Sequence, residues 1–194
     1  MTEREWDKRL RIQTTGREDE TGTRFSPYEP TPYPVLARLA DSGWIGPENH
    51  LLDYGCGKGR VVFFLASQLG CRATGLDYSE KLIAIAEENR RRSGVRGVDF
   101  IRARAEQHAP REEDVFFFFN PFSEAVLAIA LRRILDSGYA RPRPLRLICY
   151  YPSDGYAACL LAESALTFAG EIDCRDLFDG DNPRERLLRF DARF

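Results

Sequence analysis

The sequence is poor in metal ligands and has no apolar run that could cross a membrane. Two histidines and five cysteines without C-x-x-C spacing form no metal-ligand motif, so no metal site is expected. Apolar runs such as 61–66 and 115–119 fall far below the roughly 20 residues that span a bilayer. The charged amino terminus has no apolar segment behind it, so no signal peptide is expected. We therefore expect a cytoplasmic protein with reduced thiols and no membrane partner.

An excess of basic charge is also missing. The 28 Lys and Arg residues face 30 Asp and Glu residues, which leaves a formal net charge of −2. Tight non-specific binding to nucleic acid needs a basic excess that neutralises phosphates. Nucleic acid is therefore not favoured as a partner, although arginine clusters at 90–92 and 141–146 leave it open. No feature of the sequence predicts an oligomeric state.

The chain of 194 residues is long enough for one domain. Residues 1–30 are polar and are predicted to form an N-terminal arm, partly flexible or folding over the site, with a loose stretch at 16–23. Residues 31–194 are predicted to form a single domain. Its first helix is expected to have Thr31 as its N-cap and Pro32 at the first helical position.

Short apolar strands alternate with amphipathic helices over the rest of the chain. The predicted strands are 51–53, 72–77, 98–104, 115–119, 145–151, 171–178 and 186–194, and the predicted helices are 58–69, 79–89, 123–137 and one beginning at Ser153 or Asp154. Strands separated by single helices indicate a parallel sheet with helices on both faces, and the last two strands indicate an antiparallel hairpin. The fold class is thus α/β, with a doubly wound, mostly parallel seven-stranded sheet. Ligands bind such sheets at the carboxyl ends of the strands.

Three glycines at alternate positions follow the first strand: Gly55, Gly57 and Gly59. They permit a tight turn and close backbone approach by a ligand, but dinucleotide-binding proteins share the G-x-G pattern. Asp53, two residues before the first glycine, would repel a pyrophosphate and attract an ammonium group. S-adenosylmethionine carries an ammonium group and no phosphate. The alternative is that Asp53 only caps the turn.

An acidic residue also ends the second strand. Asp77 lies 22 residues after Gly55, close to the spacing of about 20 residues expected for an acid that binds ribose hydroxyls. Both nicotinamide cofactors and S-adenosylmethionine have a ribose, so Asp77 supports either. Its alternative role is to stabilise the dipole of the next helix. Tyr78 is expected either to lie against adenine or to pack in the core.

The segments 53–60 and 75–77 resemble the first two motifs of the class I S-adenosylmethionine-dependent methyltransferases, and the order of elements is similar to that family over about residues 31–194. The resemblance implies S-adenosylmethionine as the cofactor. It implies a cofactor site formed by Asp53, Tyr54, Gly55, Cys56, Gly57, Gly59, Asp77, Tyr78, Ala105, Glu106 and Asn120.

The chain departs from this family after the third strand. Members usually carry an Asp or Asn there that reaches the adenine amine, whereas this chain has Arg104 in that slot. Adenine recognition is therefore expected to fall to the backbone near Ala105 or to Glu106. Pro-Thr-Pro-Tyr at 30–33 and Asn-Pro-Phe at 120–122 are similar to a bacterial branch of the family.

Asn120, Pro121 and Phe122 are the candidate catalytic residues. They resemble the (Asn/Asp)-Pro-Pro-aromatic motif of methyltransferases that modify planar nitrogens, with one proline missing. An amide oxygen and a backbone carbonyl could accept both hydrogens of an amino group, while a ring stacks on the planar acceptor. The alternative is a plain strand exit with Ser123 as the cap of the next helix. Tyr28, Tyr33, Tyr150 and Tyr151 could line the same rim, or could simply pack.

Three functions follow from these patterns. The first is in-line methyl transfer from S-adenosylmethionine to an unidentified acceptor, such as a planar nitrogen in RNA, protein or a small molecule. The second is an NAD(P)-dependent oxidoreductase, which the charge of Asp53 disfavours. The third is a non-catalytic S-adenosylmethionine-binding protein.

Overall fold

The structure is a computed structural model that describes residues 1–16 and 28–194, so part of the predicted loose stretch at 16–23 lies outside the described residues. The strands are β1 (His50–Tyr54), β2 (Arg72–Asp77), β3 (Val98–Arg102), β4 (Val115–Phe118), β5 (Leu145–Tyr150), β6 (Thr167–Asp173) and β7 (Arg186–Ala192). The helices are α1 (Glu3–Leu10), α2 (Tyr33–Asp41), α3 (Arg60–Leu69), α4 (Glu80–Ser93), α5 (Glu124–Ala140) and α6 (Asp154–Ala162). Short 3-10 turns occupy Ala105–Gln107 and Arg175–Leu177.

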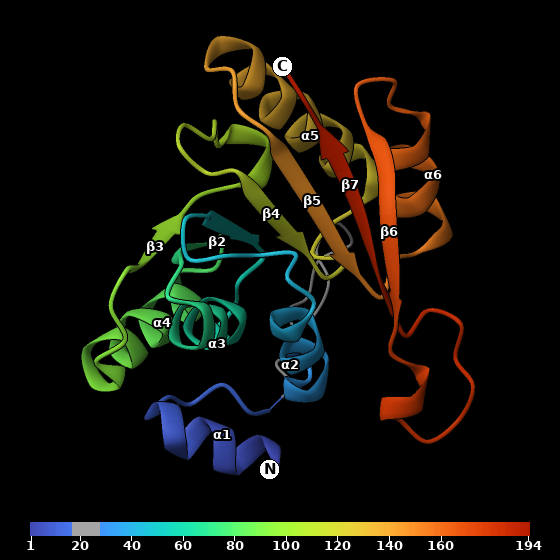
Figure 1. The fold of residues 1–194 in the computed structure, drawn as a ribbon. Helices are drawn as coiled ribbons and strands as arrows, with labels where there is room; N and C mark the ends of the chain where they lie inside the picture. The colour runs from blue at the N-terminus through green and yellow to red at the C-terminus, as the bar shows by residue number, and fades with distance from the viewer. Residues whose placement is uncertain (17–27) are drawn as a thin grey trace.

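The strands form one seven-stranded sheet in the order β3-β2-β1-β4-β5-β7-β6 (Figure 1). Strands β1 to β5 run parallel to one another, and β7 pairs antiparallel with both β5 and β6. The predicted fold class is confirmed. Because β1 lies between β2 and β4, the winding of the sheet reverses at β1, and the carboxyl ends of these three strands adjoin one another there.

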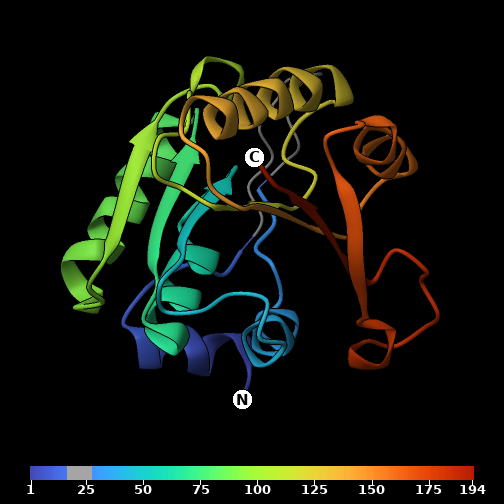
Figure 2. The ribbon, with the colours of Figure 1, turned by 45° about the horizontal axis from the view of Figure 1, so that its top comes forward.

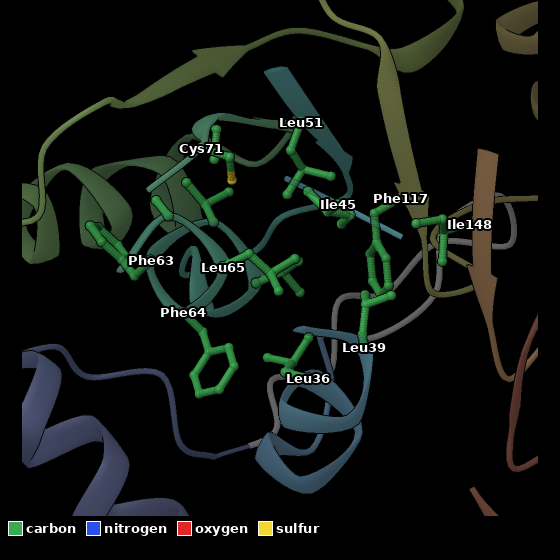
Figure 3. Packing of buried hydrophobic residues seen from close by; sticks show 14 of the residues in the cluster. Leu36, Leu39, Ile45, Leu51, Phe63, Phe64, Leu65, Cys71, Phe117 and Ile148 are labelled. Carbon is green, nitrogen blue, oxygen red and sulfur yellow. The ribbon is translucent and has the colours of Figure 1, made fainter. Parts of the chain in front are cut away.

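The sheet separates two apolar cores. Helices α2 and α3 cover one face, where Leu36, Leu65 and Phe117 pack together (Figure 3). Helices α5 and α6 cover the other face, where Phe116 and Phe118 are buried (Figure 1). Strand β4 is therefore apolar on both faces, as a central strand must be.

The polar N-terminal arm contains a helix that the sequence reasoning missed. Helix α1 has a capping box in which Thr2 accepts from the Glu5 N–H and Glu5 accepts from the Thr2 N–H. Trp6 stacks on Tyr33 and meets Phe64 edge-on, which anchors α1 to the outer side of α2 and α3 (Figures 1 and 2). The Thr-x-x-Glu spacing was the available signal.

Asp7 of α1 holds the following segment in place. Its carboxylate accepts hydrogen bonds from the N–H and hydroxyl groups of Thr14 and Thr15 and from the Tyr33 hydroxyl at 2.6 Å. Burial opposes the ionisation of Asp7, but these hydrogen bonds outweigh burial and lower its pKa. Residues 11–16 are consequently attached to the domain rather than extended away from it.

Two predicted starts of helices are wrong. Thr31 is not an N-cap, because α2 begins at Tyr33 with Pro32 as its N-cap. The carbonyl of Thr31 instead accepts a hydrogen bond from Arg60. Helix α3 begins at Arg60 rather than at residue 58, because Gly59 adopts a left-handed conformation with φ +89°.

The final hairpin is also shifted from its prediction. Strand β6 begins at Thr167 and ends at Asp173. The Asp173 carboxylate accepts from both the backbone N–H and the guanidinium of Arg175, and this turns the chain into a 3-10 turn before residue 178. Over the two described stretches, no helix combines the length and hydrophobicity that a bilayer span requires.

We expect Asp7→Asn to lower the free energy of unfolding by about 2–3 kcal/mol near neutral pH, because hydrogen bonds to a charged group contribute about 1.5–3 kcal/mol each. The folded-state pKa of Asp7 is depressed, so its stabilisation is present above the ordinary Asp pKa and is lost as pH falls through the folded value. Urea denaturation from pH 7 to pH 3 measures the difference from wild type. The difference should shrink with acid, and exposed Asp41→Asn should show none; a pH-independent difference would contradict this account.

Candidate cofactor site

A cavity opens at the carboxyl ends of β1, β2 and β4, where the sheet reverses. It has a volume of about 820 Å³, with space open to solvent included. The predicted site residues on its wall are Asp53, Gly55, Cys56, Asp77, Tyr78, Ala105, Pro121 and Phe122. The other predicted site residues, which do not line it, are Tyr54, Gly57, Gly59, Glu106 and Asn120. The walls also include Arg60, Phe119 and the segment 28–31.

The glycine turn is closely packed on both sides. The N–H of Gly55 donates to the Leu76 carbonyl at 2.8 Å, which ties the turn to the end of β2. A Cβ atom on Gly55 would lie 2.3 Å from the Cβ of Pro121, and one on Gly57 would lie 2.2 Å from the Tyr28 ring. Both glycines also have positive φ, so a larger residue would be strained as well as crowded.

Asp77 joins the exits of β1 and β2. One carboxylate oxygen accepts from the Gly57 N–H and the other from the Ser79 N–H, each at 2.9 Å. The helix that follows is capped by Ser79, as predicted. Asp77 therefore shapes the glycine turn and also faces the cavity.

Asp53 is a buried acid with an uncompensated oxygen. The residue is 3% exposed, and its Oδ2 atom has no hydrogen-bond partner among the described residues. Burial, and secondly the nearby Asp77 carboxylate, raise the pKa of Asp53 well above its ordinary value. A cationic group in the cavity would compensate both carboxylates. An ammonium-bearing ligand fits this site, whereas a pyrophosphate would add a third negative group.

Tyr54 does not bring its side chain to this region. Its ring is buried in the other core and stacks on Phe118, with ring centres 5.0 Å apart. Tyr33 is buried in the first core. Tyr28 does reach the cavity wall, where its hydroxyl donates to the Thr14 carbonyl at 2.6 Å. The cover from the arm thus comes from Tyr28 and not from Tyr33.

The region after β3 forms the short turn Ala105–Gln107. Ala103 and Ala105 line the cavity. Glu106 lies outside that lining and forms an ion pair with Arg104 at 3.7 Å. Of the two expected adenine contacts, the backbone near Ala105 is therefore the one that faces the cavity.

Phe119, Pro121 and Phe122, which follow β4, line the cavity. Asn120 does not line it, and its side chain bonds to the segment after β5 instead. The Asn120 amide donates to the Tyr151 carbonyl at 2.5 Å and accepts from the Ser153 N–H at 3.3 Å. Both residues follow β5. Asn120 and Tyr151 each have positive φ, so the two strand exits are held in an unusual backbone conformation.

Comparisons with known proteins agree with this geometry. A sequence model of the methyltransferase domain family matches residues 45–149. A curated protein-lysine N-methyltransferase of Saccharolobus islandicus is 31% identical over 72 residues, which span 37% of this chain and 45% of that protein. The aligned region therefore covers less than half of the curated relative.

Solved structures share the fold. An RNA methyltransferase from Salinibacter ruber, in complex with S-adenosyl-L-homocysteine, superposes with a TM-score of 0.60 at 19% identity, covering 85% of this chain and 94% of that chain. The N-methyltransferase NodS from Bradyrhizobium japonicum, with the same ligand, has a TM-score of 0.58 at 17% identity, with coverages of 83% and 84%. The family match spans more than half of the residues and includes both acidic strand exits and the glycine turn. The chain belongs to the methyltransferase domain family and shares the fold of these solved methyltransferases.

Proposed function

We propose that this chain transfers the methyl group of S-adenosylmethionine to a nucleophilic atom of an acceptor that reaches the cavity at the end of β4. The observation that carries the proposal is the buried, uncompensated Asp53 carboxylate on the wall of a cavity that also contains Asp77. Two acids at adjoining strand exits suit a ligand with an ammonium group and ribose hydroxyls. They do not suit the pyrophosphate of a nicotinamide cofactor.

The cofactor supplies a methyl group bonded to a sulfonium sulfur. As the methyl group bonds to the acceptor, the carbon–sulfur bond breaks and the neutral thioether, S-adenosylhomocysteine, is a good leaving group. The protein has therefore mainly to bind, orient and exclude water. In this proposal Asp53 holds the ammonium and Asp77 accepts from the ribose hydroxyls. Tyr78 and Ala105 also line the cavity, and in this proposal Tyr78 and the backbone of Ala105 contact the adenine. Orientation of this kind supplies up to about 7–11 kcal/mol in well-aligned reactions.

The acceptor side of the proposal consists of Phe119, Pro121 and Phe122, which form an apolar and aromatic wall at the β4 exit. Such a wall suits a flat group, and we propose a planar nitrogen of RNA, protein or a small molecule as the acceptor. The bonds of Asn120 to Tyr151 and Ser153 support a positioning role, in which Asn120 fixes the two exits that carry this wall.

A thermal unfolding series tests the cofactor assignment. We expect S-adenosylmethionine and S-adenosylhomocysteine to raise the unfolding temperature, because a ligand at 100 times its dissociation constant adds about 2.7 kcal/mol. NAD and NADP should produce no shift. A shift with the nicotinamide cofactors alone would refute the proposal. Incubation with methyl-labelled cofactor and separated RNA, protein and small-molecule fractions then distinguishes an enzyme from a silent binding protein.

Asp53→Asn should raise the free energy of unfolding of the unliganded protein and weaken the binding of the cofactor. The folded-state pKa of Asp53 is raised, so its charge destabilises the unliganded fold at neutral pH and ceases to do so below the ordinary Asp pKa. We expect the variant to gain about 1–3 kcal/mol of unfolding free energy at pH 7, because the amide keeps the shape of the side chain but carries no buried charge. The gain should disappear toward pH 4.

The same variant should bind S-adenosylhomocysteine at least about tenfold more weakly, since a charged hydrogen bond is lost. Titration calorimetry measures the affinity, and Asp99→Asn, at an exposed position on β3, is the matched control. A variant that is destabilised and binds normally would contradict the role given to Asp53.

Asn120→Ala should lower turnover about 10- to 100-fold, because the acceptor wall shifts and the acceptor is no longer oriented toward the methyl group. In this proposal the substitution removes no contact with the cofactor. Affinity for S-adenosylhomocysteine should change less than about threefold, a free-energy change below that of one ordinary hydrogen bond. Asn49→Ala is a matched control, because its amide also uses both atoms, with Asp114 and Gly46, away from the cavity. Equal losses of turnover in the two variants would mean that Asn120 is only a structural residue.

A further inference from the structure

Glu29 lies on the wall of the cavity between two anchored residues. Before it, Tyr28 is buried, and its hydroxyl donates to the Thr14 carbonyl at 2.6 Å. After it, Thr31 is buried, and its carbonyl accepts from Arg60 at 3.2 Å. The backbone that carries Glu29 is therefore fixed at the cavity.

The side chain of Glu29 is exposed and makes no hydrogen bond or ion pair with the part of the chain that the structure describes. Two further carboxylates line the cavity among the described residues, Asp53 and Asp77, and both are buried. In the proposed function these two bind the cofactor. Glu29 is the carboxylate of the wall that is left for the acceptor.

The arginines at this edge of the sheet do not cancel the charge of Glu29. Arg60 lines the cavity, but its side chain is 2% exposed and forms an ion pair with Glu3 of α1. Arg184, in the loop before β7, donates to the carbonyls of Tyr151 and Pro152. Each guanidinium group is thus turned to the chain itself.

The segments around the acceptor wall carry charge of one sign. These are the segment before α2 and the segments after β4 and β5, namely 28–31, 119–124 and 151–155. Their charged residues are Glu29, Glu124 and Asp154, all exposed, and the three segments contain no Lys or Arg. Such an entrance attracts a cation and repels a polyanion.

We infer that Glu29 selects an acceptor with a positively charged nitrogen group, a guanidinium or an ammonium group, and takes the proton that this group loses. The inference rests on the proposed function and narrows its acceptor to a cation. A guanidinium group combines charge with a flat face, which suits the wall of Phe119, Pro121 and Phe122.

The transfer balances with Glu29 as the proton acceptor. At the acceptor, one N–H bond breaks and one N–C bond forms, while the C–S bond to the neutral thioether breaks. Two positive charges enter, and they leave as the methylated cation and one proton. The proton passes to the Glu29 carboxylate and, because this side chain is exposed, from there to solvent.

Identification of the methylated atom tests the acceptor class. The full chain is incubated with methyl-labelled S-adenosylmethionine and a heat-treated cell extract, and the labelled product is hydrolysed and separated by chromatography. We expect label on the basic nitrogen of an arginine, a lysine or a small amine, and separate protein and small-molecule fractions distinguish these sources. Label on a nucleobase, a neutral amide or an oxygen atom would overturn the inference. No label in any fraction would refute the proposed function itself.

Substitution of Glu29 tests its role on the labelled acceptor. Glu29→Gln should lower kcat/KM about tenfold or more at low salt, the effect of one charge-assisted hydrogen bond. Glu29→Asp, which keeps the charge, should recover part of this loss. Glu48→Gln is the matched control, because Glu48 is exposed and does not line the cavity. Affinity for S-adenosylhomocysteine, measured by titration calorimetry, should change less than about twofold in all three variants.

Salt provides a second readout that a merely structural role would not move. The attraction of an exposed carboxylate is screened, so the difference in KM between wild type and Glu29→Gln should narrow from about 0.05 M to about 0.5 M NaCl. Equal kcat/KM in wild type and Glu29→Gln, or an equal loss in Glu48→Gln, would overturn the inference. A parallel loss of S-adenosylhomocysteine affinity in Glu29→Gln would also overturn it.

Discussion

The burial of the Asp53 carboxylate at the point where the sheet reverses is the constraint on which the site depends. Strand β1 is flanked by β2 and β4, so Asp53 is enclosed by neighbouring strands and cannot turn to solvent. The glycine turn and Asp77 close around it, and burial raises its pKa. Such an arrangement is unfavourable for the unliganded protein and favourable for a cation, which is the balance expected of a binding site.

The N-terminal segment belongs to the same physical account. Asp7 anchors residues 14 and 15, and Arg60 is held by Glu3, Thr14 and Thr31 at the start of α3. The ring of Tyr28 packs against Gly57 and covers the glycine turn. The wall of the cavity and the docking of α1 therefore share Arg60, so a substitution that loosens α1 is expected to disturb the cavity as well.

Local sequence patterns were sufficient for the order of strands and helices in the sheet domain and for the positions of its two acidic strand exits. The Asp53 and Asp77 strand exits could be predicted because each acid is one of the last two residues of its own strand, and parallel strands bring such exits together. Arg60 was missed because its partners lie 29 to 57 residues away and join it only through tertiary packing. The partners of Asn120 follow β5, so its side-chain direction was equally invisible in the motif.

A crystal structure of the complex with S-adenosylhomocysteine tests the central claim most directly. The account predicts the ligand ammonium within about 3.2 Å of Asp53, with the ribose hydroxyls at Asp77. A ligand bound with its amino-acid end away from Asp53, or outside the cavity at the β1 exit, would contradict it.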